Sequence, residues 1–248
     1  MSTNTMSKTT ETPAKKSLLS KEWLIEQKSL IALIFLIVVV SFLNPNFFTV
    51  DNILNILRQT SVNAIIAVGM TLVILTAGID LGVTMVYTDG RPISTGFTDT
   101  ADAFAWFGTG YAMGIPVPVW IMTVVFAAVW YLLNHTRFGR YVYALGGNES
   151  ATRLSGIDVD KVKIGVYAIC GLLAAVAGII VASRLSSAQP TAGMGYELDA
   201  IAAVVLGGTS LAGGRGRIMG TLIGALIIGF LNNALNLLDV SSYYQMIA

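Results

Sequence analysis

Long apolar runs separated by short polar segments dominate the pattern of hydrophobic and polar positions along the chain. Runs of this kind are typical of membrane-spanning helices, which need about 20 predominantly apolar residues. The pattern predicts spans at 29–43, 62–78, 116–133, 164–183 and 218–238, with a weaker apolar run at 200–212. The expected fold class is therefore all-α, a polytopic transmembrane helical bundle.

The first 28 residues are expected to lie outside the bilayer core. Residues 1–16 are rich in Ser, Thr and Lys and are predicted to be a disordered cytoplasmic tail. Residues 17–28 mix Leu, Trp and Ile with Lys and Glu, which predicts an amphipathic helix at the membrane interface. A plain extension before the first span is the alternative. After an Asn-Pro-Asn stop at 44–46, Thr49 is expected to cap a short helix that ends near Arg58.

Composition supports a membrane protein and excludes several other classes. Of the 248 residues, 54% are hydrophobic and only 12% are charged, whereas soluble domains carry about 25% charged residues. A net charge of +1 and a mean hydropathy of +0.71 argue against a soluble globular protein, a disordered chain and a basic nucleic-acid binder. The single cysteine, Cys170, excludes an intramolecular disulfide and a Cys-based metal site.

Basic residues predict the orientation of the spans. Lysines before the first span place the N-terminus in the cytoplasm, and basic residues place the segments 135–163 and 213–217 on the same side. From residue 116 onward these assignments agree with alternating spans. Two earlier spans return the chain to the cytoplasm at Asp80, yet the polar stretch 84–115 must lie outside. An odd number of crossings is therefore missing between Asp80 and Thr84. We expect a deletion there, with abnormal insertion of one half as the alternative.

The sequence offers no recognisable catalytic or metal-binding cluster. His135 is a lone histidine in a predicted cytoplasmic loop, and no predicted span carries a pair of carboxylates. The glycine-rich stretch 207–216 lacks the Lys-Ser/Thr ending of a phosphate-binding loop, so the chain is not expected to hydrolyse ATP. Gly220 and Gly224 are interpreted as helix-packing positions. No catalytic residue, metal or cofactor is predicted for this chain.

The cytoplasmic segment 137–163, RFGRYVYALGGNESATRLSGIDVDKVK, has an ordered pattern of its own. A short helical turn at 150–154 is predicted between glycines, parallel to the membrane. Such a turn would be a rigid projection that fits a partner's groove, and a loop without a partner is the alternative.

Within this segment, YALGGNESATRLSGI resembles the coupling segment of ribose-type sugar permeases in bacterial ATP-binding cassette importers. The resemblance covers nearly the whole chain after residue 20 and is carried by stretches at 23–34, 44–81, 96–108, 183–193 and 195–238. It implies the transmembrane bundle of the ribose/branched-chain-type importer permeases, as a single domain at 17–248 with a coupling loop at 135–163. It also implies that further segments of the family are missing after Leu81 and after Ala248.

The function implied by the resemblance is that of the permease subunit of an ATP-driven sugar importer, with ribose as the expected sugar. It places the chain in the bacterial inner membrane, as a multi-pass protein with a cytoplasmic N-terminus. The implied partners are a cytoplasmic ATP-binding subunit that holds ATP and Mg²⁺, a periplasmic sugar-binding protein, a second copy of the chain and membrane lipid. Nucleic acid is not among them. A permease for another small sugar or related solute, and a truncated transport-inactive membrane chain, are the alternatives.

Two groups of residues are the candidate sites. The contacts that couple the permease to the ATPase are expected at Gly147, Asn148, Glu149, Thr152, Arg153 and Gly156. Glu149 and Arg153 are the expected docking contacts, and Gly147 and Gly156 are expected to let the backbone turn; a locally capped surface helix is the alternative.

The second group is expected in the last span, where amides are available for the hydroxyl groups of a sugar in the translocation path. These amides belong to Asn232, Asn233 and Asn236. Hydrogen bonds between helices are an equally good interpretation of all three. Glu197 and Asp199 are placed outside the membrane, as helix caps, and a substrate role is the alternative.

Overall fold

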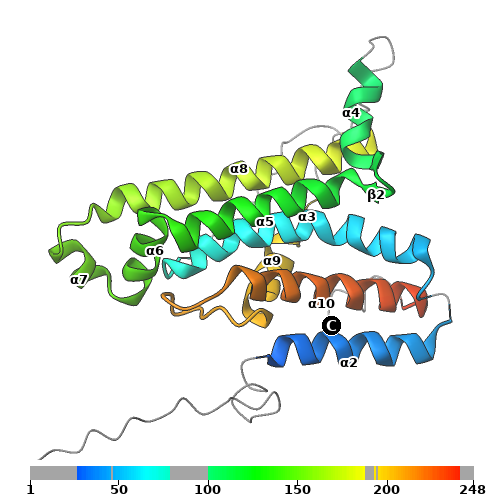
Figure 1. Ribbon diagram of the computed structural model, residues 1–248, viewed down its shortest axis with the longest axis horizontal. Helices are drawn as coiled ribbons and strands as arrows, with labels where there is room; N and C mark the ends of the chain where they lie inside the picture. Colours follow the sequence, from blue (N-terminus) through cyan, green and yellow to red (C-terminus); the bar gives the residue numbers. More distant parts are fainter. Residues whose placement is uncertain (1–26, 46, 79–99, 188–192, 194, 241–248) are drawn as a thin grey trace, which may run out of the picture.

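The computed structural model describes residues 27–45, 47–78, 100–187, 193 and 195–240, which form a bundle of helices (Figure 1). The elements are α2 (Lys28–Leu43), α3 (Val50–Leu75), α4 (Thr100–Thr109), β1 (Tyr111–Ala112), β2 (Ile115–Pro116), α5 (Val117–His135), α6 (Arg137–Gly147), α7 (Glu149–Leu154), α8 (Val159–Leu185), α9 (Tyr196–Leu206) and α10 (Ile218–Leu237). Within these residues α3, α5, α8 and α10 are long and apolar enough to cross a membrane. The predicted all-α transmembrane bundle is confirmed.

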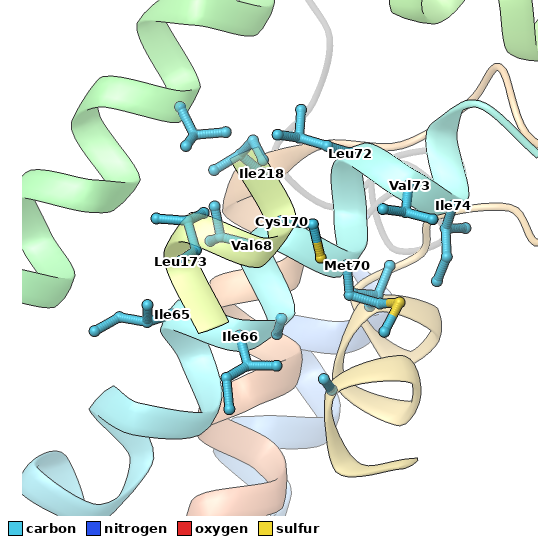
Figure 2. Packing of buried hydrophobic residues seen from close by; sticks show 14 of the residues in the cluster. Ile65, Ile66, Val68, Met70, Leu72, Val73, Ile74, Cys170, Leu173 and Ile218 are labelled. Carbon is cyan, nitrogen blue, oxygen red and sulfur yellow. The ribbon is translucent and has the colours of Figure 1, made fainter. Parts of the chain in front are cut away.

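Helix α3 is the centre of the bundle. It is in contact with α5, α8, α9 and α10, and between Thr60 and Thr76 every residue except Asn63 is buried. Figure 2 shows its side chains packed against Cys170 of α8 and Ile218 of α10. A helix that other helices surround buries side chains on all its faces, and α3 does so although α8 is the more apolar of the two.

Contacts along the helices fix their relative directions. Helix α10 runs antiparallel to α3, because Asn52, Thr60 and Thr71 of α3 lie against Asn233, Gly229 and Thr221 of α10 in reverse order. Helices α2 and α8 run in the same direction as α10, and α5 runs in the same direction as α3 (Figure 1). We call the end that carries α6, α7 and the end of α3 the cytoplasmic end, following the basic residues there.

The consecutive long helices α3 and α5 are therefore parallel. Helix α3 ends at the cytoplasmic end, where the carbonyl of Leu75 accepts a hydrogen bond from Gly214 N–H at 2.9 Å. Helix α5 begins at the opposite end, beside Tyr111, whose ring lies under the guanidinium of Arg58 near the start of α3. The connection at 79–99 lies outside the described residues. Two consecutive spans that run in the same direction need a further crossing between them. The parallel directions of α3 and α5 therefore agree with the missing crossing predicted from charge placement.

The structure corrects the predicted helix boundaries at α3. A break near Arg58 was expected, but the helix continues without interruption from Val50 to Leu75. No glycine or proline lies between positions 58 and 62, and the hydroxyl of Ser61 donates to the carbonyl of Arg58 at 2.7 Å, within the helix. The polar residues are thus accommodated without ending the helix.

The predicted apolar run at 200–212 is also corrected. Helix α9 begins earlier, at Tyr196, and ends at Leu206, so its 11 residues span only about 16 Å. The polar segment at 135–163 contains α6 as well as α7, and the stretch before α5 contains α4 and the small β1–β2 hairpin. The expected interfacial helix at 17–28 and the tail at 1–16 fall almost entirely outside the described residues.

Candidate coupling and transport sites

Helix α6 holds the cytoplasmic segment against the bundle. Thr136 caps its first turn by accepting a hydrogen bond from Gly139 N–H at 3.3 Å, and the Tyr143 hydroxyl donates to the carbonyl of Gly216 at 3.0 Å. Burial raises the pKa of the Tyr143 hydroxyl above its ordinary value. A Cβ at Gly146 would lie 1.8 Å from the carbonyl oxygen of Leu75. The end of α6 is therefore in direct contact with the end of α3.

Helix α7 and its flanking residues, 148–156, form a small projection that we call the knob. The side chain of Asn148 accepts from Ala151 N–H at 2.9 Å, and the Thr152 hydroxyl donates to the Asn148 carbonyl at 2.8 Å. Thr152 is buried, so it anchors the knob from within. Gly156 has φ +82°, which favours glycine. Gly147 lies in the last turn of α6 with open space around its Cβ position, so the turn requires Gly156 and not Gly147.

The charged side chains of the knob are engaged with one another and with α8. Both carboxylate oxygens of Glu149 accept from the Lys163 ammonium at 2.9 Å, and Arg153 lies 3.7 Å from Glu149 and 3.2 Å from Asp160. The hydrogen bond from Lys163 holds the pKa of Glu149 below its ordinary value. Glu149 and Arg153 do lie on one face, as their spacing predicts, and they fasten the knob to α8.

The most exposed apolar side chain of the knob was not among the predicted residues. Leu154, the last residue of α7, is 89% exposed. It stands at the end of the bundle that carries the basic residues. Its sequence signal was a single leucine between Arg153 and Ser155 in an otherwise polar stretch.

The three predicted asparagines of α10 differ in their surroundings. Asn233 is buried, and its amide exchanges two hydrogen bonds with the amide of Asn52 on α3, at 2.9 and 3.1 Å. These bonds join helix to helix, which was the alternative to a sugar contact. Asn232 is partly buried and Asn236 is exposed. A role of these amides in the translocation path stays a prediction.

A further polar pair lies within the bundle. The amide of Asn63 donates to a carboxylate oxygen of Asp199 at 3.3 Å. Asn63 lies half-way along α3 and Asp199 lies in the first turn of α9. Asp199 therefore lies level with the middle of α3, because α9 begins there. The sequence placed it outside the membrane, and that placement stays a prediction. Within the described residues, no group of three or more His, Cys, Asp or Glu side chains is arranged to hold a metal ion.

The chain matches the family model described as "Branched-chain amino acid transport system / permease component" over residues 85–248. It is 58% identical to the ribose import permease protein of Escherichia coli K12, in an alignment that covers 96% of this chain and 94% of that protein. It is 59% identical to the ribose import permease protein of Haemophilus influenzae, over 91% and 90% of the two chains. The identity to the Bacillus subtilis protein of the same name is 48%, over 88% and 87%. No solved structure is significantly similar to the chain.

The alignments also show an internal difference in length. The alignment with the E. coli ribose permease extends over 303 positions, although this chain has 248 residues, so at least 55 positions have no counterpart here. The match to the family model begins at residue 85, three residues after Gly82. The relatives named above are permease proteins of import systems, which makes the chain a transporter subunit and not an enzyme. The chain thus belongs to the permease-component family of the branched-chain amino acid type, which includes bacterial ribose import permeases.

Proposed function

We propose that this protein is the membrane subunit of an ATP-driven ribose importer in the bacterial inner membrane. The proposal rests on the similarity to ribose import permeases along nearly the whole chain. A permease of this kind works with an ATPase and a substrate-binding protein. The ATPase would bind ATP and Mg²⁺ in the cytoplasm, and the sugar-binding protein would deliver ribose from the periplasm.

The orientation and assembly follow from the same proposal. The N-terminus lies in the cytoplasm, because α2 begins at the end that carries the basic turn at 213–217 and the knob. Two copies of the chain form one translocation path across the lipid bilayer. The single permease domain at 17–248, with its coupling loop at 135–163, contains the described bundle.

The knob is the proposed docking element for the ATPase. Glu149 and Arg153 fasten it to α8 through Lys163 and Asp160. Asn148 and Thr152 stiffen it, and Leu154 offers the apolar anchor. Closure of the ATPase on ATP would push the knob, and the contact of Gly146 with the carbonyl of Leu75 would pass the displacement to α3.

Replacing Leu154 tests the docking element. Burial of a leucine side chain contributes about 1.5–3 kcal/mol, so Leu154→Ser should weaken binding of the ATPase by about 10- to 100-fold. Leu211, 55% exposed in the turn between α9 and α10, is the matched control, and Leu211→Ser should leave binding unchanged. Equal binding by both variants would exclude Leu154 as the anchor.

A second candidate function is that of a transport-inactive chain that still binds the ATPase. The parallel directions of α3 and α5, together with the 55 or more absent positions, favour it. The experiment is to express the chain with a ribose ATPase and binding protein in cells that lack their own ribose permease. Uptake of radiolabelled ribose, with no uptake of arabinose, supports the importer. Co-purification of the ATPase without ribose uptake supports the inactive chain.

A further inference from the structure

The Asn63–Asp199 pair stands out because it is polar and partly exposed within the most buried stretch of the protein. Asn63 is the one residue between Thr60 and Thr76 that is not buried. Its amide donates to the Asp199 carboxylate at 3.3 Å, and Asp199 is also partly exposed. An amide and a carboxylate from two different helices therefore reach the surface of the bundle side by side.

The pair lies near the middle of α3 and α10, two of the helices that are long and apolar enough to cross a membrane. Asn63 is the fourteenth of the 26 residues of α3, so about 18–20 Å of helix extends on either side. The contacts of Thr60 with Gly229 and of Thr71 with Thr221 lie above and below it, which places it at the middle of α10 as well. The hydrocarbon core is about 30 Å thick, so neither end of it is near this level.

Helix α9 confirms the depth from the other direction. The carbonyl of Leu206, its last residue, accepts from the Ser29 hydroxyl at the cytoplasmic start of α2, and Gly207 packs against Gly220 near the start of α10. Its 11 residues extend about 16 Å, roughly half the hydrocarbon thickness. Helix α9 thus begins within the membrane, and Asp199 lies in its first turn.

Lipid cannot be the neighbour of this pair. An ionisable side chain at the centre of a bilayer is costly when it faces acyl chains, and such residues face a bundle interior or a water-filled cavity. Lysine and arginine can extend their heads to the interface, but the side chain of aspartate is too short to reach water 15 Å away. The surface that carries Asn63 and Asp199 must therefore meet water or polar groups at mid-depth.

We propose that Asn63 and Asp199 line the water-filled sugar passage at its mid-point, and that they bind the hydroxyl groups of the neutral sugar as it crosses. This inference rests on the proposed function. A carboxylate accepts hydrogen bonds from hydroxyl groups, and an amide can both donate and accept. The pair therefore suits an uncharged polyol, whose hydroxyl groups both donate and accept. Half-helices that end at the midplane next to a substrate are a recurring arrangement in transporters.

Accessibility of single cysteines to a charged, membrane-impermeant thiol reagent tests the proposal on the chain as it exists. Cys170, the only cysteine, is buried and is replaced first by Cys170→Ala. Asn63→Cys is then introduced in that background, in membranes, and the rate of labelling is measured. The matched controls are Leu172→Cys and Ile179→Cys on α8, both apolar positions that are more than half exposed. Gly69 contacts Cys170, so in the antiparallel α8 these two positions bracket the depth of Asn63.

The expected result is labelling of Asn63→Cys at least ten times faster than of either control. Labelling of Asn63→Cys as slow as the lipid-facing controls would overturn the proposal. If Asn63→Cys does not fold, Asp199→Cys is tested against the same controls with the same expectation. Labelling does not require transport. A chain that fails to import ribose yet is labelled at position 63 would therefore contradict the proposed function and still support the inference that Asn63 lines a water-filled passage.

Discussion

The reciprocal amide pair of Asn52 and Asn233 gives the sharpest quantitative test of the helix packing. Each amide donates to the other, at 2.9 and 3.1 Å, and Asn52 also donates to the carbonyl of Phe47 at 2.9 Å. Hydrogen bonds between membrane helices contribute about 0.6 kcal/mol on average and up to about 1.7 kcal/mol. Two of them on one pair predict a coupling free energy of about 1–3 kcal/mol.

The perturbation is a double-mutant cycle of Asn52→Ala and Asn233→Ala. Each single replacement leaves the other amide without its partner, which costs about 1–3 kcal/mol for a buried group. The double variant should therefore be little less stable than the worse single variant. The assay is the free energy of unfolding in mixed micelles titrated with sodium dodecyl sulfate, and Asn55→Ala, at an exposed position of α3, is the control.

Additive losses would refute the reasoning. Independent sites add to within about 0.3–0.5 kcal/mol, so a coupling free energy below about 0.4 kcal/mol would mean that the two amides do not stabilise the α3–α10 contact. The Asn233 amide would then be available to a sugar, as the first interpretation of the last span had it. A coupling free energy above 1 kcal/mol assigns Asn233 to helix packing.

Three further predictions concern the knob and the α3–α10 contact. Gly156→Ala, at φ +82°, should destabilise the knob by about 1–2 kcal/mol, detected as faster proteolysis of the loop, whereas Gly147→Ala should have no effect. The pKa of Glu149 lies below its ordinary value, so its ion pair with Lys163 stabilises the knob above about pH 4.5 and is lost as the pH falls through the lowered value. The protection of α7 amides against hydrogen exchange, relative to their intrinsic rate at each pH, should therefore fall only in acid. Glu149→Gln should abolish that pH dependence. Gly229→Ala places a Cβ 1.8 Å from the hydroxyl of Thr60, which should cost about 1–3 kcal/mol of unfolding free energy and be largely rescued by Thr60→Ala.

Hydropathy alone was sufficient to predict two of the long membrane-spanning helices. The spans at 116–133 and 218–238 correspond to α5 and α10 with ends within two residues. Helix α6 was missed because its glycines read as loop residues. Gly139 and Gly146 are instead close contacts with the carbonyls of Leu133 and Leu75, where any Cβ would collide. Only the packed structure distinguishes a glycine that permits a contact from one that permits a turn.

The candidate sites were only partly predictable, because they depend on partners distant in sequence. The position of α7 was predicted within one residue, but its ion pair with Lys163, 14 residues away, depends on how α8 returns past the knob. Asn233 was found, whereas its partner Asn52 lies 181 residues away. The position of Asp199 beside the middle of α3 could not be predicted, because hydropathy reports which residues are apolar and carries no information on the level at which a short helix begins.

The parallel directions of α3 and α5 connect the sequence, the structure and the comparisons in one argument. The 24 residues between Leu75 and Thr100 are long enough when extended to pass from one end of the bundle to the other, so length does not prevent a crossing. The charges of residues 79–99 oppose a crossing, because the segment includes three aspartates and an arginine. The free energy of placing each of these side chains at the bilayer centre is about 2.5–3.5 kcal/mol.

An apolar crossing is therefore needed at this position, and the absent alignment positions, at least 55 of them, exceed the roughly 20 residues of one span. We expect that insertion of the unmatched segment of the E. coli ribose permease between Leu81 and Gly82 lets the chain reach the start of α5 through an apolar span. Ribose uptake should then rise. A polar insert of equal length is the control, because it supplies length without an apolar span. If the permease segment raises uptake no more than the polar insert does, the parallel helices are joined in some other way and the missing crossing is not the defect.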